Sequence, residues 1–138
     1  MPRPRRNLRH NKPVEEHEVY AAIGTEGFER LIAAFYKQIP GDDILGPMYR
    51  GRDLSAAEER LRGFLIYRFG GPQTYIDTRG HPRLRMRHAP FVIDQPARDR
   101  WMQLMRAALL EANLPADAGD VLLRFFESTA SAMVNRIE

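Results

Sequence analysis

The chain has 138 residues, a length that suits a single domain with one hydrophobic core. Apolar residues make up 43% of it and charged residues 28%, so the composition gives no case for general disorder, and the formal net charge is only +3. The absence of cysteine excludes disulfides, thiolate nucleophiles and cysteine-bound metal centres, so any metal must rest on histidine, on carboxylates or on a prosthetic group.

Residues 1–13 are predicted to form a disordered basic arm, and residues 14–138 the globular domain. The arm carries Arg3, Arg5, Arg6 and Arg9 and is interrupted by prolines, so it offers little to bury. Its charge leaves open a contact with nucleic acid or with an anionic membrane surface. No apolar run has the length of a signal peptide core or of a membrane span, and a cytoplasmic location is therefore expected.

Two helical segments are expected first along the chain. A short one contains Val19, Tyr20 and Ile23 and stops at Gly24. A longer one starts at Thr25 and is ended by Pro40-Gly41. Its apolar residues follow the spacing of a single helical face: they are Phe28, Leu31, Ile32, Phe35 and Ile39.

A further helix is expected from Ser55, which forms a plausible capping box with Glu58, to the Gly70-Gly71-Pro72 stop. One face of this helix carries its apolar residues, namely Ala57, Leu61, Phe64 and Leu65. The paired acids Glu58-Glu59 and Asp42-Asp43 are interpreted as structural, because carboxylates at helix N-termini offset the helix dipole.

Between Tyr75 and Phe91 the helical spacing fails, and a loop is expected with a turn or two of helix near Leu84 to His88. Pro96 then suits the first turn of another helix, which leaves at Leu114-Pro115. The apolar face of that helix carries Trp101, Leu104, Met105 and Ala108, and the face of the last helix carries Leu122, Phe125, Phe126, Thr129 and Met133. No useful segment alternates apolar and polar residues, so an all-α single domain is predicted.

Four histidines are present, and His88 is the strongest candidate for chemistry. His10 and His17 lie in polar stretches, and His81 stands between Gly80 and Pro82 in the expected loop. His88 precedes Ala89-Pro90, and the proline forbids continuation of a helix. Taken alone, such a histidine is more often a buried residue with satisfied hydrogen bonds than a metal ligand.

The arginines around His88 indicate an acidic ligand. Arg83, Arg85 and Arg87 would act as forked donors to carboxylates, while a nearby guanidinium makes ionisation of the imidazole harder. A neutral imidazole with several arginines fits haem, a planar metal cofactor with acidic side groups. The same loop also fits a phosphate ligand.

The chain resembles the group II truncated haemoglobins from about Val19 to Asn135. The resemblance rests on the order of several short motifs, each of them weak alone. They are Phe35-Tyr36, Tyr49-Arg50, Arg52-Asp53-Leu54, Glu58-Glu59-Arg60-Leu61, Gly70-Gly71-Pro72 with Tyr75, Arg79 to Phe91, and Trp101. Two departures are the basic arm and Arg68-Phe69, where relatives often carry an aromatic pair. The basic arm leaves the oligomeric contacts at that end open, and Arg68-Phe69 is expected to affect packing more than chemistry.

The resemblance implies a two-over-two helical fold around haem b, with His88 as the proximal iron ligand. It places Ala57 and Leu61 over the iron, where neither side chain can bind it, and leaves the sixth position open. Tyr36, Tyr49 and Trp101 become the distal donors to a bound diatomic molecule.

The remaining cofactor contacts are expected at the edge of the haem. Arg87 and Tyr75 are the preferred partners of its acidic groups, with Arg60 as a third. Phe91, like Phe35 and Phe64, is expected to pack in the core with haem as one of the surfaces it touches.

The function implied is binding of O2, CO or NO, with slow redox activity toward NO or peroxide left open. The reductase partner and the oligomeric state also stay open. The rival hypothesis is a cofactor-free helical module that binds nucleic acid through the arm and the Arg79 to Arg87 loop. That loop has aromatic residues only at its edges, which disfavours stacking on bases.

Overall fold

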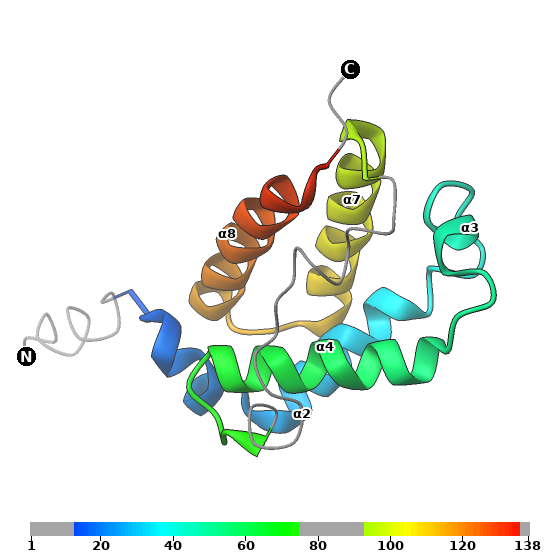
Figure 1. Ribbon diagram of the computed structural model, residues 1–138. Helices are drawn as coiled ribbons and strands as arrows, with labels where there is room; N and C mark the ends of the chain where they lie inside the picture. The colour runs from blue at the N-terminus through cyan, green and yellow to red at the C-terminus, as the bar shows by residue number, and fades with distance from the viewer. Residues whose placement is uncertain (1–12, 75–92, 136–138) are drawn as a thin grey trace, which may run out of the picture.

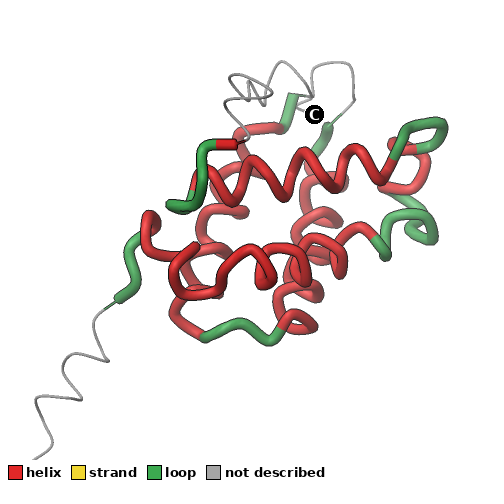
Figure 2. The backbone as a smooth tube through the Cα atoms, turned by 90° about the horizontal axis from the view of Figure 1, so that it is seen from below, coloured by secondary structure: helices red, strands yellow, loops and turns green. Residues whose placement is uncertain are grey.

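The computed structural model describes residues 13–74 and 93–135, and these ranges contain helices and no strand (Figure 2). A 3-10 turn, η1 (Glu16–Glu18), leads directly into α2. The helices are α2 (Val19–Tyr36), α3 (Leu45–Tyr49), α4 (Leu54–Arg68), α7 (Gln95–Ala112) and α8 (Ala116–Met133). The all-α prediction is therefore confirmed.

The long helices form two pairs, one over the other (Figure 1). Helices α7 and α8 run antiparallel, side by side, and α2 packs against α4 beneath them. Contacts between α2 and α7 join the two pairs. Their apolar faces meet in one core whose largest fully buried side chains include Phe28, Phe35, Phe69, Phe126, Met102 and Met105. Burial of each such side chain contributes roughly 1.5–3 kcal/mol.

The break expected at Gly24 is present as a kink inside α2, where Gly24 has φ 69° and ψ 176°. Left-handed φ values strain residues with a Cβ, so glycine suits this position. The predicted face of α2 is confirmed, since Phe28, Leu31 and Phe35 are all fully buried.

The C-terminal end of α2 comes three residues before the predicted one. The helix ends at Tyr36, and the chain continues in tighter turns in which the N–H of Ile39 donates to the carbonyl of Tyr36 at 3.1 Å. Pro40 disfavours helical geometry at the residue before it, which explains the early exit. Ile39 still reaches the core and is fully buried.

The cap predicted for α4 was wrong. The helix begins at Leu54, and its N-cap is Asp53, whose carboxylate accepts a hydrogen bond from the N–H of Ala56 at 3.1 Å. Ser55 lies already inside the first turn. The stop at Gly70-Gly71 is confirmed: Gly70 has φ 99°, and a Cβ there would lie 2.0 Å from the carbonyl oxygen of His17.

Replacement of Asp53 by alanine is expected to lower the free energy of unfolding by about 1 kcal/mol, the usual cost of a lost N-cap. Ser55→Ala is the matched control and should change it by only a few tenths of that amount. Urea unfolding followed by circular dichroism measures both. A larger loss for Ser55→Ala than for Asp53→Ala would restore the cap that the sequence had suggested.

The ends of α7 lie where the sequence predicts them. Asp94 caps α7 by accepting from the N–H of Ala97 at 2.9 Å, and Pro96 occupies the first turn as expected. Asn113 adopts a left-handed conformation with φ 53° and ends α7 shortly before Pro115. No helix within the described ranges is both long and apolar enough to cross a membrane.

Helix α3 was not predicted. Its five residues, including Gly46 and Pro47, carry no helical periodicity. The helix is organised instead by Asp42, whose carboxylate accepts from the N–H groups of Ile44 at 3.0 Å and Leu45 at 2.8 Å. The interpretation of Asp42 as a structural acid is confirmed.

Candidate functional site

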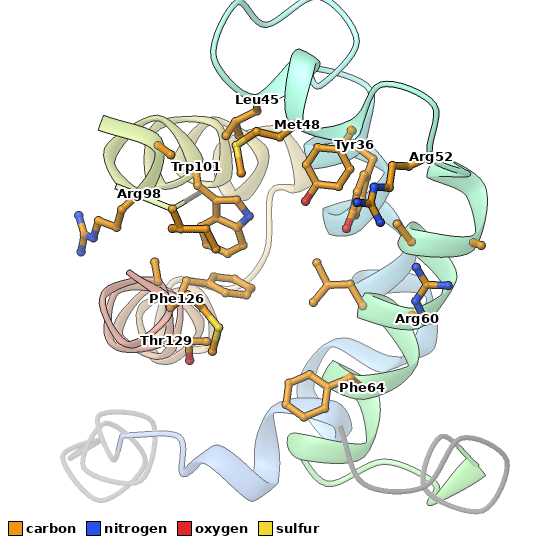
Figure 3. Close-up of a pocket in the computed structure, with 18 of the residues that line it drawn as sticks. Tyr36, Leu45, Met48, Arg52, Arg60, Phe64, Arg98, Trp101, Phe126 and Thr129 are labelled. Atoms are coloured by element: carbon orange, nitrogen blue, oxygen red, sulfur yellow. The ribbon is translucent and has the colours of Figure 1, made fainter. Parts of the chain in front are cut away.

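A cavity of about 410 Å³ lies between α2, α3 and α4 on one side and α7 and α8 on the other (Figure 3). This volume is in the range typical of sites for small molecules and cofactors. The lining is predominantly apolar. From the N-terminal half it comprises Tyr36, Leu45, Met48, Tyr49, Arg52, Asp53, Ala56, Ala57, Arg60, Leu61 and Phe64. From the C-terminal half it comprises Ile93, Ala97, Arg98, Trp101, Phe125, Phe126, Thr129, Ala130 and Met133.

Three aromatic side chains with polar hydrogens converge on one part of this cavity. Tyr36, at the last turn of α2, is 7% exposed, and its ring meets that of Tyr49 edge to face with centroids 6.1 Å apart. Trp101 enters from α7 (Figure 3). Phe35 lies between these groups, its ring centroid 5.1 Å from that of Tyr36 and 5.2 Å from that of Trp101. The three predicted distal donors are thus brought together.

The two phenols are hydrogen-bonded to each other. Burial raises the pKa of Tyr36; the charge of Tyr49 and a hydrogen bond to it raise that pKa further. Burial also raises the pKa of Tyr49, although its hydrogen bond with Tyr36 acts in the opposite direction. Both phenols therefore keep their protons at neutral and moderately alkaline pH. Each phenol has a single proton, so one of the two protons joins the two oxygens and the other is available to a ligand.

Helix α4 supplies the wall that faces the donors. Ala57 and Leu61 are four residues apart, so they share one face of the helix, and both line the cavity. Neither side chain has a lone pair, and the methyl group of Ala57 takes up little space. Arg60 lies beside Leu61 and contributes its guanidinium to the lining (Figure 3). All three were predicted as site residues.

The far wall is aromatic. Phe64 from α4 and Phe126 from α8 point into the cavity (Figure 3), and Phe125 completes this wall with its ring 6.4 Å from that of Phe64. Outside it, the guanidinium of Arg68 lies 5.1 Å from the centroid of Phe125 and donates to the carboxylate of Glu16 at 2.8 Å. Arg68 does not line the cavity, so its role in the described structure is one of packing.

Several cavity residues were missed by sequence reasoning. Leu45 and Met48 belong to α3, whose existence had no sequence signal, and Arg52 and Asp53 were noted only as part of a motif. Ile93 and Ala97 reach the cavity because α7 begins beside the end of α8, where the N–H of Asn135 donates to the carbonyl of Ile93 at 2.9 Å.

Four predicted cofactor contacts lie outside the described residues, namely His88, Arg87, Tyr75 and Phe91. The Arg79 to Arg87 loop and nearly all of the basic arm lie outside them as well. The metal ligation by His88 and the contacts of Arg87, Tyr75 and Phe91 with a cofactor thus remain predictions.

Comparison with known proteins places this cavity in context. The chain matches the model of the family described as "Bacterial-like globin" over residues 18–135. It is 34% identical over 119 residues to a group 2 truncated hemoglobin of Bacillus subtilis, a match that covers 86% of this chain and 89% of that protein.

Two solved hemoglobin structures have a fold similar to that of this chain. A thermostable hemoglobin from Thermobifida fusca superposes with a TM-score of 0.82 at 49% identity, covering 87% of this chain and 98% of that one. A truncated oxygen-avid haemoglobin from Bacillus subtilis gives a TM-score of 0.80 at 34% identity, covering 85% and 98%.

Proposed function

Because the chain belongs to the bacterial-like globin family and, within it, to the group II truncated haemoglobins, we propose that its cavity holds haem b and binds O2 and related diatomic molecules. The observation that carries the proposal is the convergence of Tyr36, Tyr49 and Trp101 on one apolar cavity whose opposite wall is Ala57 and Leu61. Haem supplies an iron that binds such molecules reversibly.

The chemistry of the lining fits this cofactor. Phe64, Phe125 and Phe126 offer flat apolar surface to a macrocycle, and no carboxylate other than that of Asp53 lines the described part of the cavity. Arg52 and Arg60 place guanidinium groups on the α4 side, where acidic groups at the edge of the cofactor would find forked donors (Figure 3). Arg87 and Tyr75 are proposed to serve the same groups.

We assign the proximal iron ligand to His88. A neutral imidazole is the usual haem ligand in globins, and a hydrogen bond from its second ring nitrogen orients it. Ala57 and Leu61 cannot bind a metal, so they would leave a coordination position to the diatomic ligand. His88 would thus hold the metal, and the described residues would surround the cofactor.

The distal donors favour firm retention of a partly negative ligand. A phenol O–H or an indole N–H aimed at bound oxygen stabilises it by a hydrogen bond, and the raised pKa values of Tyr36 and Tyr49 keep both phenols protonated, so that the pair has one proton to offer beyond the bond between them. Several donors would slow release. This supports sensing or slow redox chemistry toward NO or peroxide over bulk transport, and a Bacillus subtilis relative is itself described as oxygen-avid.

Absorption spectra of the full chain, reconstituted with haemin and reduced, test the proposal. We expect the spectrum to change reversibly on adding O2 and on adding CO, because both occupy the same vacant position. Protein that stays colourless with haemin and retards DNA at low salt would support the nucleic-acid hypothesis instead.

A further inference from the structure

Arg100 is tied to the loop that leads into α3. Its guanidinium Nη1 donates to Oδ1 of Asp42 at 2.7 Å and to Oδ1 of Asp43 at the same distance. The side chain of Asp42 is only 8% exposed and that of Arg100 27%, whereas that of Asp43 is 83% exposed. The partly buried Arg100–Asp42 pair is therefore the better protected from solvent screening.

Asp42 holds α3 at the same time. While one carboxylate oxygen accepts from Arg100, the other accepts from the N–H groups of Ile44 and Leu45, and the carbonyl of Asp42 accepts from the N–H of Gly46 at 3.0 Å. Five residues are too few for a helix to be stable alone. The position of α3 thus depends on Asp42, and through Asp42 on Arg100.

Both ends of this connection carry a distal donor. Tyr49 is the last residue of α3, and Trp101 follows Arg100 directly on α7. Successive residues of a helix point about 100° apart, so one turn of α7 directs Arg100 toward α3 and Trp101 into the cavity. Tyr49 is in turn hydrogen-bonded to Tyr36. The ion pair therefore spans the two elements that carry Tyr49 and Trp101.

We propose that Arg100, with Asp42 and Asp43, is a positioning residue that holds Tyr49, the hydrogen-bond partner of Tyr36, in register with Trp101 and so sets the rate of ligand release. Arg100 is absent from the cavity lining, and it acts only through the elements it joins. The part of the inference that concerns ligand release rests on the proposed function, whereas the part that concerns the environment of Trp101 does not.

Arg100→Met removes the ion pair while keeping much of the aliphatic length of the side chain. Asp42→Asn combined with Asp43→Asn removes it from the other side, and an asparagine oxygen at position 42 can still accept from the backbone of α3. Arg106→Met is the matched control: Arg106 also lies on α7 and pairs with Glu127 at 2.6 Å, but neither residue lines the cavity.

With haem bound, we expect O2 dissociation to accelerate roughly three- to tenfold in Arg100→Met and in the double asparagine variant, the size typical of residues that act through packing. The O2 dissociation rate of Arg106→Met should stay within about twofold of the parent rate, because an exposed ion pair contributes little. A stopped-flow experiment that displaces O2 with CO measures these rates. Equal rates in Arg100→Met and Arg106→Met would overturn the proposal.

Trp101 provides a second readout that needs no ligand. It is the only tryptophan in the chain, so fluorescence of the full-length protein without haem reports on this position alone. We expect acrylamide to quench Trp101 more strongly in Arg100→Met than in the parent or in Arg106→Met. Unchanged quenching in Arg100→Met would contradict the positioning role, even if the protein proved not to bind haem; failure of haem binding itself would contradict only the proposed function.

Discussion

Replacement of His88 by glycine is expected to abolish stable haem binding and O2 uptake, and free imidazole is expected to restore both. Glycine removes the only side chain proposed to bond the iron, and free imidazole supplies the same nitrogen ligand. The absorption spectrum of the reconstituted variant, recorded with and without imidazole, measures the loss and the rescue. An imidazole concentration of about 10 mM exceeds the dissociation constant of a weak small ligand, which is on the order of 1 mM.

His81→Gly is the matched control for this experiment. The same substitution is made in the same segment, seven residues before His88, at a histidine expected to be a loop residue without a metal. Its spectrum and its O2 affinity should equal those of the parent. A His88→Gly variant with a normal spectrum and normal affinity in the absence of imidazole would refute the assignment of the iron ligand.

Removal of a single distal donor should have the next largest effect. In Tyr36→Phe and in Trp101→Phe we expect O2 dissociation to accelerate by roughly ten- to a hundredfold. The reason is that a hydrogen bond to a charged acceptor contributes about 1.5–3 kcal/mol and each 1.4 kcal/mol corresponds to a factor of ten. Laser photolysis and stopped-flow displacement by CO measure the rates.

Tyr20→Phe controls for the loss of a phenol as such. Tyr20 lies on the same helix as Tyr36, but its hydroxyl is paired with Thr25 at 2.8 Å and it does not line the cavity. Its O2 dissociation rate should match that of the parent. Parental rates in both Tyr36→Phe and Trp101→Phe would remove the argument for firm retention by distal donors.

Tyr49→Phe separates two roles within the phenol pair. Because the two phenols are hydrogen-bonded to each other, loss of the Tyr49 oxygen leaves the Tyr36 proton free for the ligand while it removes any donation by Tyr49 itself. A slower dissociation than in the parent would identify Tyr36 as the stronger donor. A faster one would identify Tyr49 as a donor in its own right.

Much of the fold followed from local sequence patterns. The faces of α2, α7 and α8, a break at Gly24 and the stop at Gly70 were all predicted, because apolar spacing and glycine or proline at helix ends act within a few residues. The break at Gly24 is a kink within one helix rather than the end of a separate helix. The errors were also local. Two acceptable caps stood two residues apart at the start of α4, and Asp53 rather than Ser55 makes the hydrogen bond.

The candidate site was predictable only where a motif marked it. Tyr36, Tyr49, Trp101, Ala57, Leu61 and Arg60 were named from the order of motifs, and all line the cavity. Leu45 and Met48 were not, because a five-residue helix has too few turns to show periodicity. Ile93 and Ala97 carry no chemical signal at all, since they reach the cavity through the pairing of α7 with α8.

The sequence by itself determined the long helices and their apolar faces, because these depend on side-chain chemistry and on spacing within one segment. The donor candidates came from the resemblance that the order of the motifs carries. Only the tertiary structure decided that Tyr36 and Tyr49 form a hydrogen-bonded pair, that Asp42 organises α3, and that Arg100 joins α3 to α7. Such contacts link residues up to 58 positions apart. Their geometry is set by the packing of one helix pair over the other, which no local pattern encodes.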